Sequence, residues 1–595
     1  MNEQQEIQFD AQPTIKGFPE LRWTGKRPYR STVYYPAQLR ESYGSSAEGG
    51  EHDGWMNKIF WGDNIQVMSH LLRDYRGKVD LIYIDPPFDS KADYKKKIKL
   101  RGETVTNDSS VFEEKQYGDI WTNDEYLQFM YERLILCREL LAETGSIYLH
   151  CDWHKSHHLR MILDEIFGPG RFVNEIVWCY SIGGKSKAFF ARKHDTIFWY
   201  SKGADFVFNG QDPNVTVPRK PNSHMKVQID EDGREFQEKR DKKSGKVYRY
   251  YVDEGKIPED YWLDIEQLNR EDAQRSGYPT QKPEKLIARI VAASTNPGDL
   301  IFDCFAGSGT TQAVAMKLGR RFIGADINLG ATQTMTKRLI SVAQELEGKQ
   351  GQLDLSSSEC EGLKYTGFEV FNVNNYDFFR NPIEAKSLLL QALEVQPFPQ
   401  TEVFDGELDG RMVKVMPVNR LATKADLADL LANLPYKTYE RRRDENPGKV
   451  VERITLVCMG HEPDLKAYLE QELDEYKVEV EVVDVLRDRA DLQLKREAEA
   501  EIVREGGKLV IRQFYPLNLM QKLSLQKDVV TDWRELVDSI MIDFNFDGVV
   551  MQPSITDVPD KKEMVAGIYD IPEDAGTIKV KITDVLAESL EVEVL

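Results

Sequence analysis

A largely apolar run, Val79–Ile84, leads directly into the turn Asp85-Pro86-Pro87-Phe88. An uninterrupted run of β-branched and aromatic residues predicts a buried strand, and two consecutive prolines end such a strand in a rigid turn. The turn can present one carboxylate, one carbonyl oxygen and one aromatic face together at the edge of a sheet. Two acceptors beside an aromatic ring suit a planar ring that carries an amino group. We therefore predict a buried sheet with a binding site at the end of this strand.

A second strand and turn lie much later in the chain, where residues 299–302 lead into Asp303-Cys304-Phe305-Ala306-Gly307-Ser308-Gly309-Thr310-Thr311. Glycines allow positive φ and let a ligand approach the backbone closely, and the N-terminus of the following helix attracts a negative group. A P-loop would need Gly-Lys-Ser/Thr, and a dinucleotide loop would need a third glycine where Gln312 stands. Asp326 follows the next predicted strand, where an acid can bind both ribose hydroxyls of a nucleoside cofactor. The pattern therefore predicts a site for a nucleoside cofactor that is neither a P-loop nor a dinucleotide loop.

Strands and helices alternate around both turns. We expect a helix at 65–75 with Asn64 as its cap, a strand at 79–84, a lysine-rich loop, and a helix at 124–141. A strand at 146–150, a helix at 155–167 and strands at 172–180 and 195–200 follow. The pattern resumes with a helix at 283–293, a strand at 299–302, a helix at 310–318, a strand at 321–325 and a helix at 329–346. This alternation predicts an α/β fold, with helices covering both faces of a parallel sheet.

The length of 595 residues predicts two or more domains. We expect an N-terminal arm at 1–55, α/β parts at 56–200 and 277–348, a polar insert at 201–276, and a C-terminal domain at 349–595. Within the C-terminal domain, residues 452–458, 463–476 and 477–486 predict a strand, a helix and a strand, and the tail from residue 548 alternates like β-structure.

The net charge of -21 is unevenly distributed. From residue 341 onward the chain holds about 50 acidic and about 30 basic side chains, so the earlier part is close to neutral. That earlier part contains basic clusters interleaved with aromatic residues at 91–99, 185–193 and 239–249. Each cluster is compatible with a solvated face, while the aromatic residues favour contact with nucleic-acid phosphates. The acidic part would then face away from nucleic acid or contact a protein.

The six cysteines are scattered and the first residues are polar, which favours a reducing cytoplasm and argues against a disulfide framework or a signal peptide. The sequence contains no apolar stretch near the length of a membrane span, so we expect no membrane association.

The two turns together resemble the motifs of β-class amino-group DNA methyltransferases, which transfer a methyl group from S-adenosyl-L-methionine to adenine N6 or cytosine N4. In this class the Asp-Pro-Pro motif precedes the glycine turn, as it does here. The resemblance covers roughly residues 55–345 and is greatest to type III modification subunits and related phage-defence methylases. It implies a Rossmann-like methyltransferase fold. Other segments that resemble the family are Gly62-Asp63-Asn64, 126–130, 145–152 and 279–286.

The resemblance also implies roles for individual residues. Phe305 would contact the adenosine, Thr310 the methionine carboxylate, Asp326 the ribose and Asp63 the adenine. Asp303, Gly307 and Gly309 would complete the cofactor turn. A core aromatic remains the alternative role for Phe305, and a helix cap for Asp63.

In the same resemblance the target base flips out of the duplex and stacks on Phe88, while Asp85 and the carbonyl of Pro86 accept its amino hydrogens. Pro87 completes the motif. Family members that methylate adenine usually carry an acid or Asn at the first position, whereas cytosine-N4 members of this class usually carry Ser. Asp85 therefore favours adenine N6. The transfer needs no covalent enzyme intermediate, because placement and electrostatic fit supply the catalysis.

Two alternatives stay open: cytosine-N4 methylation, and a catalytically silent DNA-recognition or assembly subunit. We expect duplex DNA as a partner, base reading by the insert at 201–276, and self-association or docking to a restriction or defence subunit through the C-terminal domain. His154 and His158 stand one helical turn apart in a cluster with His150, Cys151, Asp152 and His157, which could suit zinc. The resemblance implies no metal there, so we expect none.

Overall fold

In the computed structural model the following residues are described: 6–9, 17, 19–47, 52–87, 93–99, 111–118, 123–181, 187–219, 221, 224–241, 244–269, 272, 274, 281–350, 365–373, 386, 389–390, 393, 395–398, 403–417, 422–446, 449–458, 461, 464–485, 498–517, 519–520, 530, 532–559, 563–585 and 588–594.

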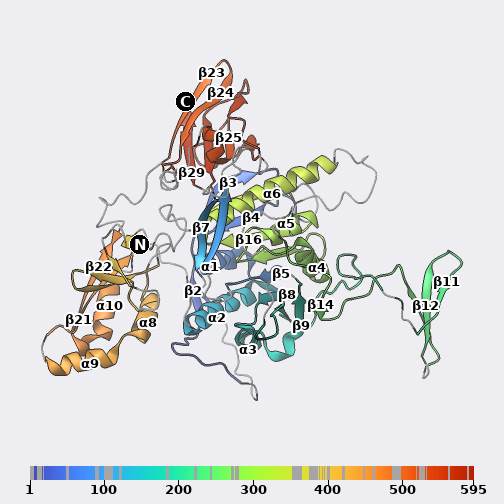
Figure 1. Cartoon of the computed structure of the whole chain (residues 1–595), viewed down its shortest axis with the longest axis horizontal. Helices are drawn as coiled ribbons and strands as arrows, with labels where there is room; N and C mark the ends of the chain where they lie inside the picture. Colours follow the sequence, from blue (N-terminus) through green and yellow to red (C-terminus); the bar gives the residue numbers. More distant parts are fainter. Residues whose placement is uncertain are drawn as a thin grey trace.

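A ten-stranded sheet in the order β14-β9-β10-β8-β5-β15-β16-β4-β17-β3 forms the centre of the molecule (Figure 1). The strands from β8 to β17 run parallel, whereas β10 and β3 are antiparallel to their neighbours. The predicted parallel sheet is therefore mixed, because β10 follows β9 without a crossover helix. The strands are β3 (Ala37–Tyr43), β4 (Asn57–Trp61), β5 (Val79–Ile84), β8 (Leu141–Cys151), β9 (Phe172–Cys179), β10 (His194–Ser201), β14 (Tyr261–Trp262), β15 (Leu300–Asp303), β16 (Arg321–Asp326) and β17 (Phe368–Val373).

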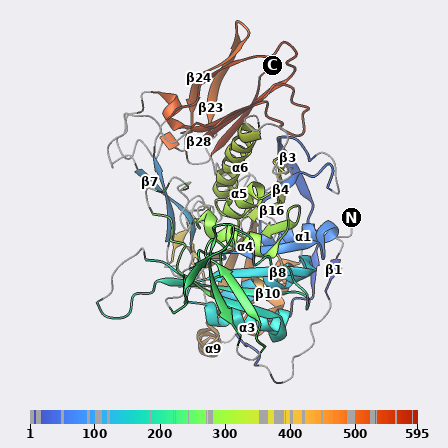
Figure 2. The same ribbon diagram turned by 90° about the vertical axis from the view of Figure 1, so that its right-hand side faces the viewer.

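Helices cover both faces of this sheet, which confirms the predicted α/β class (Figures 1 and 2). Apolar residues of α1 (Asn64–Tyr75), α2 (Asn123–Leu140) and α3 (Ser156–Phe167) share one core cluster with the strands. Those of α4 (Glu284–Ser294), α5 (Thr310–Lys317) and α6 (Leu329–Gln350) share a second. The sheet thus has two separate cores, as a sheet buried on both faces requires.

One edge of the central sheet is formed by two segments outside the predicted α/β part. β3 comes from the segment expected to be an arm, and β17 lies beyond the boundary expected at 348, yet they pair with each other and β17 pairs with β4. Tyr43 and Phe368 stack across this pair with ring centroids 4.9 Å apart. The backbone of β17 pairs with the N–H and C=O groups along β4 that would otherwise be exposed. No local sequence pattern predicts this pairing.

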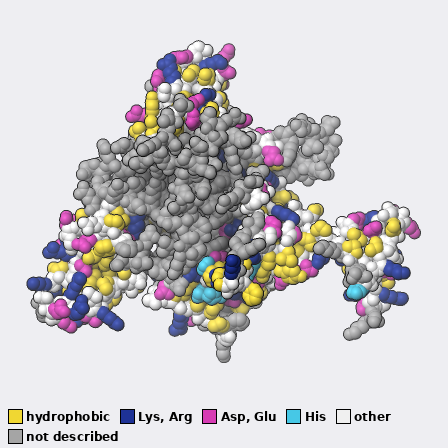
Figure 3. Space-filling view, viewed as in Figure 1, with side chains coloured by type: hydrophobic (Ala, Val, Ile, Leu, Met, Phe, Trp, Pro, Cys, Tyr) yellow, Lys and Arg dark blue, Asp and Glu magenta, His cyan; other side chains and the backbone are white. Residues whose placement is uncertain are grey.

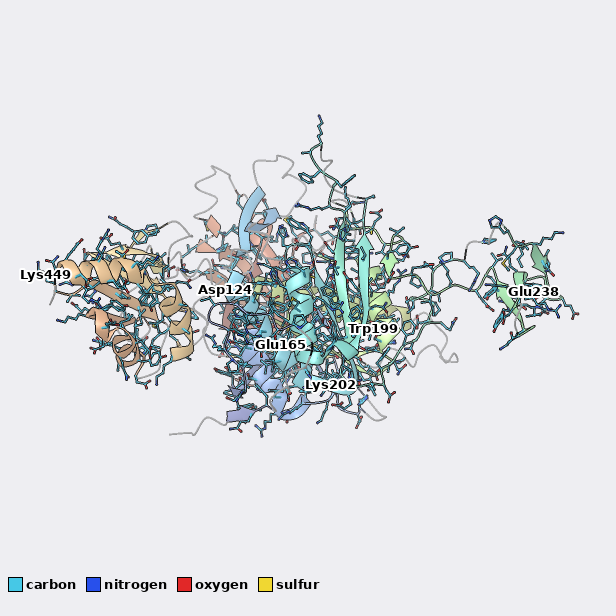
Figure 4. The ribbon with its side chains drawn as sticks, turned by 90° about the horizontal axis from the view of Figure 1, so that it is seen from below. Asp124, Glu165, Trp199, Lys202, Glu238 and Lys449 are labelled. Atoms are coloured by element: carbon cyan, nitrogen blue, oxygen red, sulfur yellow. The ribbon has the colours of Figure 1, made fainter. Side chains whose placement is uncertain are left out.

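The polar insert contains a three-stranded antiparallel sheet of β11 (Val227–Ile229), β12 (Glu235–Arg240) and β13 (Val247–Tyr251). This sheet projects well away from the central body, as the separation of Glu238 from Trp199 shows in Figure 4. The lysine-rich segment expected to be a loop instead contains β6 (Asp93–Lys99), which pairs with β7 (Val111–Gly118). Backbone groups make this pairing, so the polar sequence of the segment did not predict a strand.

Two further units follow the main sheet. In the first, β21 (Glu452–Cys458) and β22 (Val478–Asp484) are parallel and joined by α10 (Leu465–Glu472), which confirms the predicted strand, helix and strand. The rest of this unit is β18 (Gln396–Pro397), β19 (Gly406–Leu408), β20 (Arg411–Val415), α8 (Lys424–Asn433) and α9 (Tyr436–Glu445).

None of the helices in the described part of the chain is long and apolar enough to span a membrane.

The second unit is the β-rich tail, whose sheets share one apolar core. It lies against α6 (Figures 1 and 2), where Gln333 donates a hydrogen bond to Ser589 at 2.9 Å. A buried ion pair between Lys581 and Glu41 joins it to β3. Its strands are β23 (Glu499–Glu505), β24 (Lys508–Tyr515), β25 (Val537–Asp543), β26 (Ile555–Asp557), β27 (Ile568–Asp570), β28 (Ile578–Asp584) and β29 (Ser589–Val594).

Near the N-terminus, β1 (Glu6–Gln8) and β2 (Ser31–Val33) form a separate two-stranded sheet.

Candidate active site

Neighbouring parallel strands of the central sheet carry acidic residues at one edge. Because the carboxyl ends of parallel strands meet at the same edge, acids that are far apart in the sequence come together there. A crevice at this edge is where open α/β sheets bind their ligands. The acids are Asp152 after β8, Asp85 after β5, Asp303 at the end of β15, Asp326 at the end of β16 and Asp63 after β4.

The glycine turn has the backbone conformation that its sequence requires. Gly307 and Gly309 have φ values of 52° and 73°, in the left-handed region. A Cβ atom on Gly309 would lie 2.5 Å from the side chain of Met335 in α6, so glycine is needed for space as well as for φ. The Asp303 carboxylate holds the turn by accepting hydrogen bonds from the Phe305 amide at 3.0 Å and the Thr311 hydroxyl at 2.7 Å.

Asp326 closes the same turn from the next strand. Its carboxylate accepts from the amide of Gly307 at 2.9 Å and from that of Asn328 at 2.8 Å. Burial raises the pKa of Asp326 to about 6. Burial likewise raises the pKa of Asp303 to about 7, and the charges of Asp85 and Asp326 add to this effect. An edge that concentrates acids in this way favours a cationic ligand.

Asp63 acts as the N-cap of α1, because its Oδ1 accepts from the amide of Ile65 at 2.9 Å. Asp63 therefore has the helix-cap role that was its alternative in the sequence analysis, and the prediction that Asn64 caps this helix is wrong. The Asn64 side chain instead donates to the carbonyl of Cys304 at 3.1 Å, since its side chain points toward the glycine turn. Asp63 also lies 3.4 Å from the guanidinium of Arg133.

Arg133 of α2 connects Asp63 with Phe305. Its guanidinium lies 3.4 Å from the ring centroid of Phe129, and the Phe129 ring lies 6.1 Å from that of Phe305. Burial lowers the pKa of Arg133, which the charge of Asp63 opposes. Phe305 is partly buried and packs against the core. The sequence reasoning missed Arg133, although its spacing of four residues from Phe129 places both on one helix face.

Thr310 begins α5 and is tied to two other helices. Its hydroxyl accepts a hydrogen bond from Arg338 of α6 at 2.9 Å, and the same guanidinium pairs with Glu284 of α4 at 2.8 Å. The sequence reasoning missed both partners, which lie far from Thr310 in the chain. The Thr310 hydroxyl is therefore held in place before any ligand binds.

Asp85 follows β5, and one of its oxygens, Oδ2, forms an ion pair with Lys282, just before α4. Its other oxygen, Oδ1, is buried and has no hydrogen-bond partner among the described residues. A buried acceptor without a partner is costly, so this oxygen is suited to a donor from a ligand. Pro86 is buried beside it and Pro87 is partly exposed, while Phe88 lies outside the described residues.

A chain of buried polar groups supports this region from the neighbouring strands. Burial raises the pKa of Tyr83 well above its usual range, so its phenol donates to Nδ1 of His150 at 2.9 Å. His150 Nε2 then donates to Asp195 at 3.1 Å, and the Tyr180 hydroxyl donates to the other oxygen of Asp195 at 3.1 Å. The network fixes His150 as a structural group. Within the described part of the chain, no group of three or more His, Cys, Asp or Glu side chains has the arrangement of a metal site.

In sequence, the chain is similar to DNA methyltransferases. Residues 79–337 match the DNA methylase family of the N6/N4 type. The type II methyltransferase M.EcaI of Enterobacter cloacae is 30% identical over an alignment of 393 residues that covers 57% of this chain and 82% of that protein. The DNA adenine methyltransferase YhdJ of Escherichia coli (strain K12) is 29% identical over 252 residues, 42% of this chain and 72% of that protein. The crystal structure of the M1.HpyAVI-SAM complex aligns with 48% of this chain and 99% of its own, at 19% identity and a TM-score of 0.30.

Proposed function

Since the chain belongs to the N6/N4 family of DNA methyltransferases, we propose that it methylates the N6 amino group of a specific adenine in duplex DNA. The observation that carries this proposal is the buried Oδ1 of Asp85, an acceptor without a partner in the described part of the chain. An exocyclic amino group supplies the N–H donor that this oxygen lacks. The activity would belong to a cytoplasmic restriction-modification or phage-defence system.

The acidic edge suits S-adenosyl-L-methionine, the methyl donor of the family. When bound, this cofactor supplies an electrophilic methyl group on a positively charged sulfur. The buried acids favour such a cation, and the positive φ of the glycine turn lets a nucleoside approach the backbone. The residues proposed to hold the cofactor are Asp63, Asp303, Phe305, Gly307, Gly309, Thr310 and Asp326.

In this proposal the chain catalyses methyl transfer by positioning the amino group of the target base. Asp85 and the carbonyl of Pro86 would accept the two amino hydrogens and leave the nitrogen lone pair free for methyl transfer. Lys282 holds the second oxygen of Asp85 and thereby limits its rotation. The amino nitrogen becomes positively charged during transfer, and the carboxylate stabilises that charge until the surplus proton leaves to water. Phe88 would stack on the flipped base and Pro87 would keep the turn rigid.

Target recognition is proposed for the projecting sheet β11–β13. The major groove admits a two-stranded β-ribbon, and this sheet has the same kind of backbone. It carries Arg249 and an exposed Tyr248. These side chains can contact phosphates and base edges.

The C-terminal units are proposed to serve self-association or docking to a partner subunit. The motivation is their excess of acidic over basic side chains, which disfavours DNA and leaves protein as the favoured partner. The mass of the full chain in solution tests this proposal. A monomer at all concentrations, with no subunit captured from the native host, would contradict it.

Cytosine N4 is the second candidate, because its amino group offers Asp85 the same donor. Sequencing that reads modified bases, on plasmid DNA from a methylation-deficient host that expresses the chain, separates the two. Methyl groups on adenine in one sequence context, absent with Asp85→Ala, are expected. Methyl groups only on cytosine would exclude the adenine assignment, and no methyl groups with a folded, cofactor-binding chain would favour the silent subunit.

A further inference from the structure

An exposed aromatic cluster, formed by Trp153, Phe189 and Phe190 with Arg192, has no role in the site described above. Phe190 is 99% exposed, Phe189 62% and Trp153 40%. Single exposed apolar residues are common on proteins, but a group of large rings in one place marks an interaction site. Figure 3 shows hydrophobic, histidine and basic side chains gathered over the part of the molecule where α2, α3 and β8 lie.

The sheet topology places this cluster at the edge that carries Asp85. The segment with Phe189 and Phe190 connects β9 to β10, and β10 begins beside Cys179, the last residue of β9. Thr196 of β10 is level with Cys151 at the end of β8, and β8 also pairs with β5. The connection therefore emerges where the parallel strands end, and Trp153 lies just after β8 at the same edge.

The root of the connection is held firmly. The amide of Tyr180 donates to the carbonyl of Lys193 at 3.0 Å, and the ammonium of Lys193 donates to the carbonyl of Ser181 at 2.7 Å. These two bonds close the segment like a hairpin. The exposed rings are thus presented from a fixed base, which lowers the entropy lost when they bind a ligand.

Arg192 links the two parts of the cluster. Its guanidinium lies 3.6 Å from the ring centroid of Trp153 and 5.2 Å from that of Phe189. The ring centroid of His154 lies 3.7 Å from that of Trp153, and its Nδ1 is 2.5 Å from the carboxylate of Asp152. The result is a cluster of planar side chains that includes the positive charge of Arg192, and the neighbouring Phe190 is exposed to solvent.

We propose that Phe189 and Phe190 insert into the base stack of duplex DNA next to the flipped target base, while Arg192 contacts the adjacent phosphates. This inference rests on the proposed function and adds to it the residues that open the duplex. A base that leaves the stack exposes apolar faces of its neighbours, and an aromatic wedge covers them. Lys187 and Lys193 flank the two phenylalanines, and their positive charges complement the negative phosphates of DNA.

The test uses the full chain and a duplex that contains the sequence found by methylation mapping, in two forms. In one form the target base is paired, and in the other it faces an abasic site and is already loosened. The double variant Phe189→Ala with Phe190→Ala should lose about 10-fold to 100-fold in kcat/KM on the paired duplex. It should lose less than about 3-fold on the loosened duplex, because little opening remains to be done.

A fluorescent analogue measures the opening step directly. With 2-aminopurine in place of the target adenine, the wild-type chain should raise the fluorescence, and the double variant should not. Phe190→Leu should retain most of the activity, because leucine can also act as a wedge. Tyr515→Ala, which removes an exposed ring from β24 of the C-terminal unit, is the matched control and should behave as wild type.

Equal losses on both duplexes, or normal activity of the double variant on the paired duplex, would overturn the wedge and leave the proposed function standing. A wild-type chain that methylates neither duplex would overturn the proposed function, and with it this inference.

Discussion

Lys282 forms an ion pair with Asp85 across 197 positions of sequence. Both side chains are mostly buried, at 11% and 18% exposure. The pair occupies Oδ2 of the carboxylate, while Oδ1 is buried and has no hydrogen-bond partner among the described residues. Lys282, just before α4, therefore helps to position the proposed base-binding turn.

Replacing Lys282 should impair methyl transfer without unfolding the chain. Lys282→Met leaves the Asp85 carboxylate free to rotate, so we expect a loss of about 10-fold to 1,000-fold in the single-turnover rate. Lys282→Arg keeps the charge and should retain more activity. Rapid-quench assays with saturating DNA measure the rate, and thermal unfolding checks the fold. Wild-type rates for Lys282→Met would show that the pair has no part in positioning Asp85.

Gly309→Ala should abolish cofactor binding. The added methyl group would meet Met335 at 2.5 Å, in a backbone conformation with φ of 73° that favours glycine. Strain of this kind costs about 1–3 kcal/mol. Gly548→Ala is a matched control, because its φ of 86° imposes similar strain while no atom lies within 4 Å of the added carbon. Calorimetric titration with S-adenosyl-L-methionine should show loss of binding for the first variant alone; tight binding by both would contradict a role for close packing at the turn.

The acids of the cofactor edge should make stability and ligand affinity respond to pH in opposite directions. The pKa of Asp303 is raised to about 7 and that of Asp326 to about 6, so the folded chain holds protons that the unfolded chain releases. The stabilisation from these groups is present near pH 4 and is lost as the pH rises through 7. Affinity for the cationic cofactor should instead increase over the same interval, as the carboxylates ionise.

Unfolding and calorimetric titrations between pH 5 and 8 measure both trends. Asp303→Asn removes the larger of the two contributions and should flatten the pH dependence of stability. A variant that follows the wild-type curve would assign the dependence to other groups.

The buried pair between Lys581 and Glu41 should matter for stability. Tyr43 also donates to Glu41, at 2.7 Å, so the carboxylate is part of the contact between β3 and the C-terminal unit. Lys581→Met leaves this carboxylate buried without a cation, which costs about 3–5 kcal/mol. Lys579, on the same strand as Lys581, forms a more exposed pair with Glu591 of β29, so Lys579→Met should cost about 1 kcal/mol or less. Denaturant unfolding compares the two, and equal losses would mean that the C-terminal unit does not dock through Glu41.

Much of the fold was predictable because its signals are short-ranged. The run before Asp85 and the run before the glycine turn each combine an apolar strand with turn residues, and both strands form as expected. The positive φ values at Gly307 and Gly309 follow from the same local pattern. Strands β3 and β17 were not predictable in this way, since their pairing depends on backbone groups of distant segments.

The sequence by itself determined the α/β class, the order of the two turns and the acids at the strand ends, because strand, turn and helix signals lie within a few residues of one another. Only the tertiary structure decided which of these acids stand together and what holds them. The pairing of Asp85 with Lys282, the link from Asp63 through Arg133 to Phe305, and the chain from Tyr83 through His150 to Asp195 all join residues from separate elements. Such contacts depend on how the strands are ordered in the sheet, and that order is set by the packing of the whole chain.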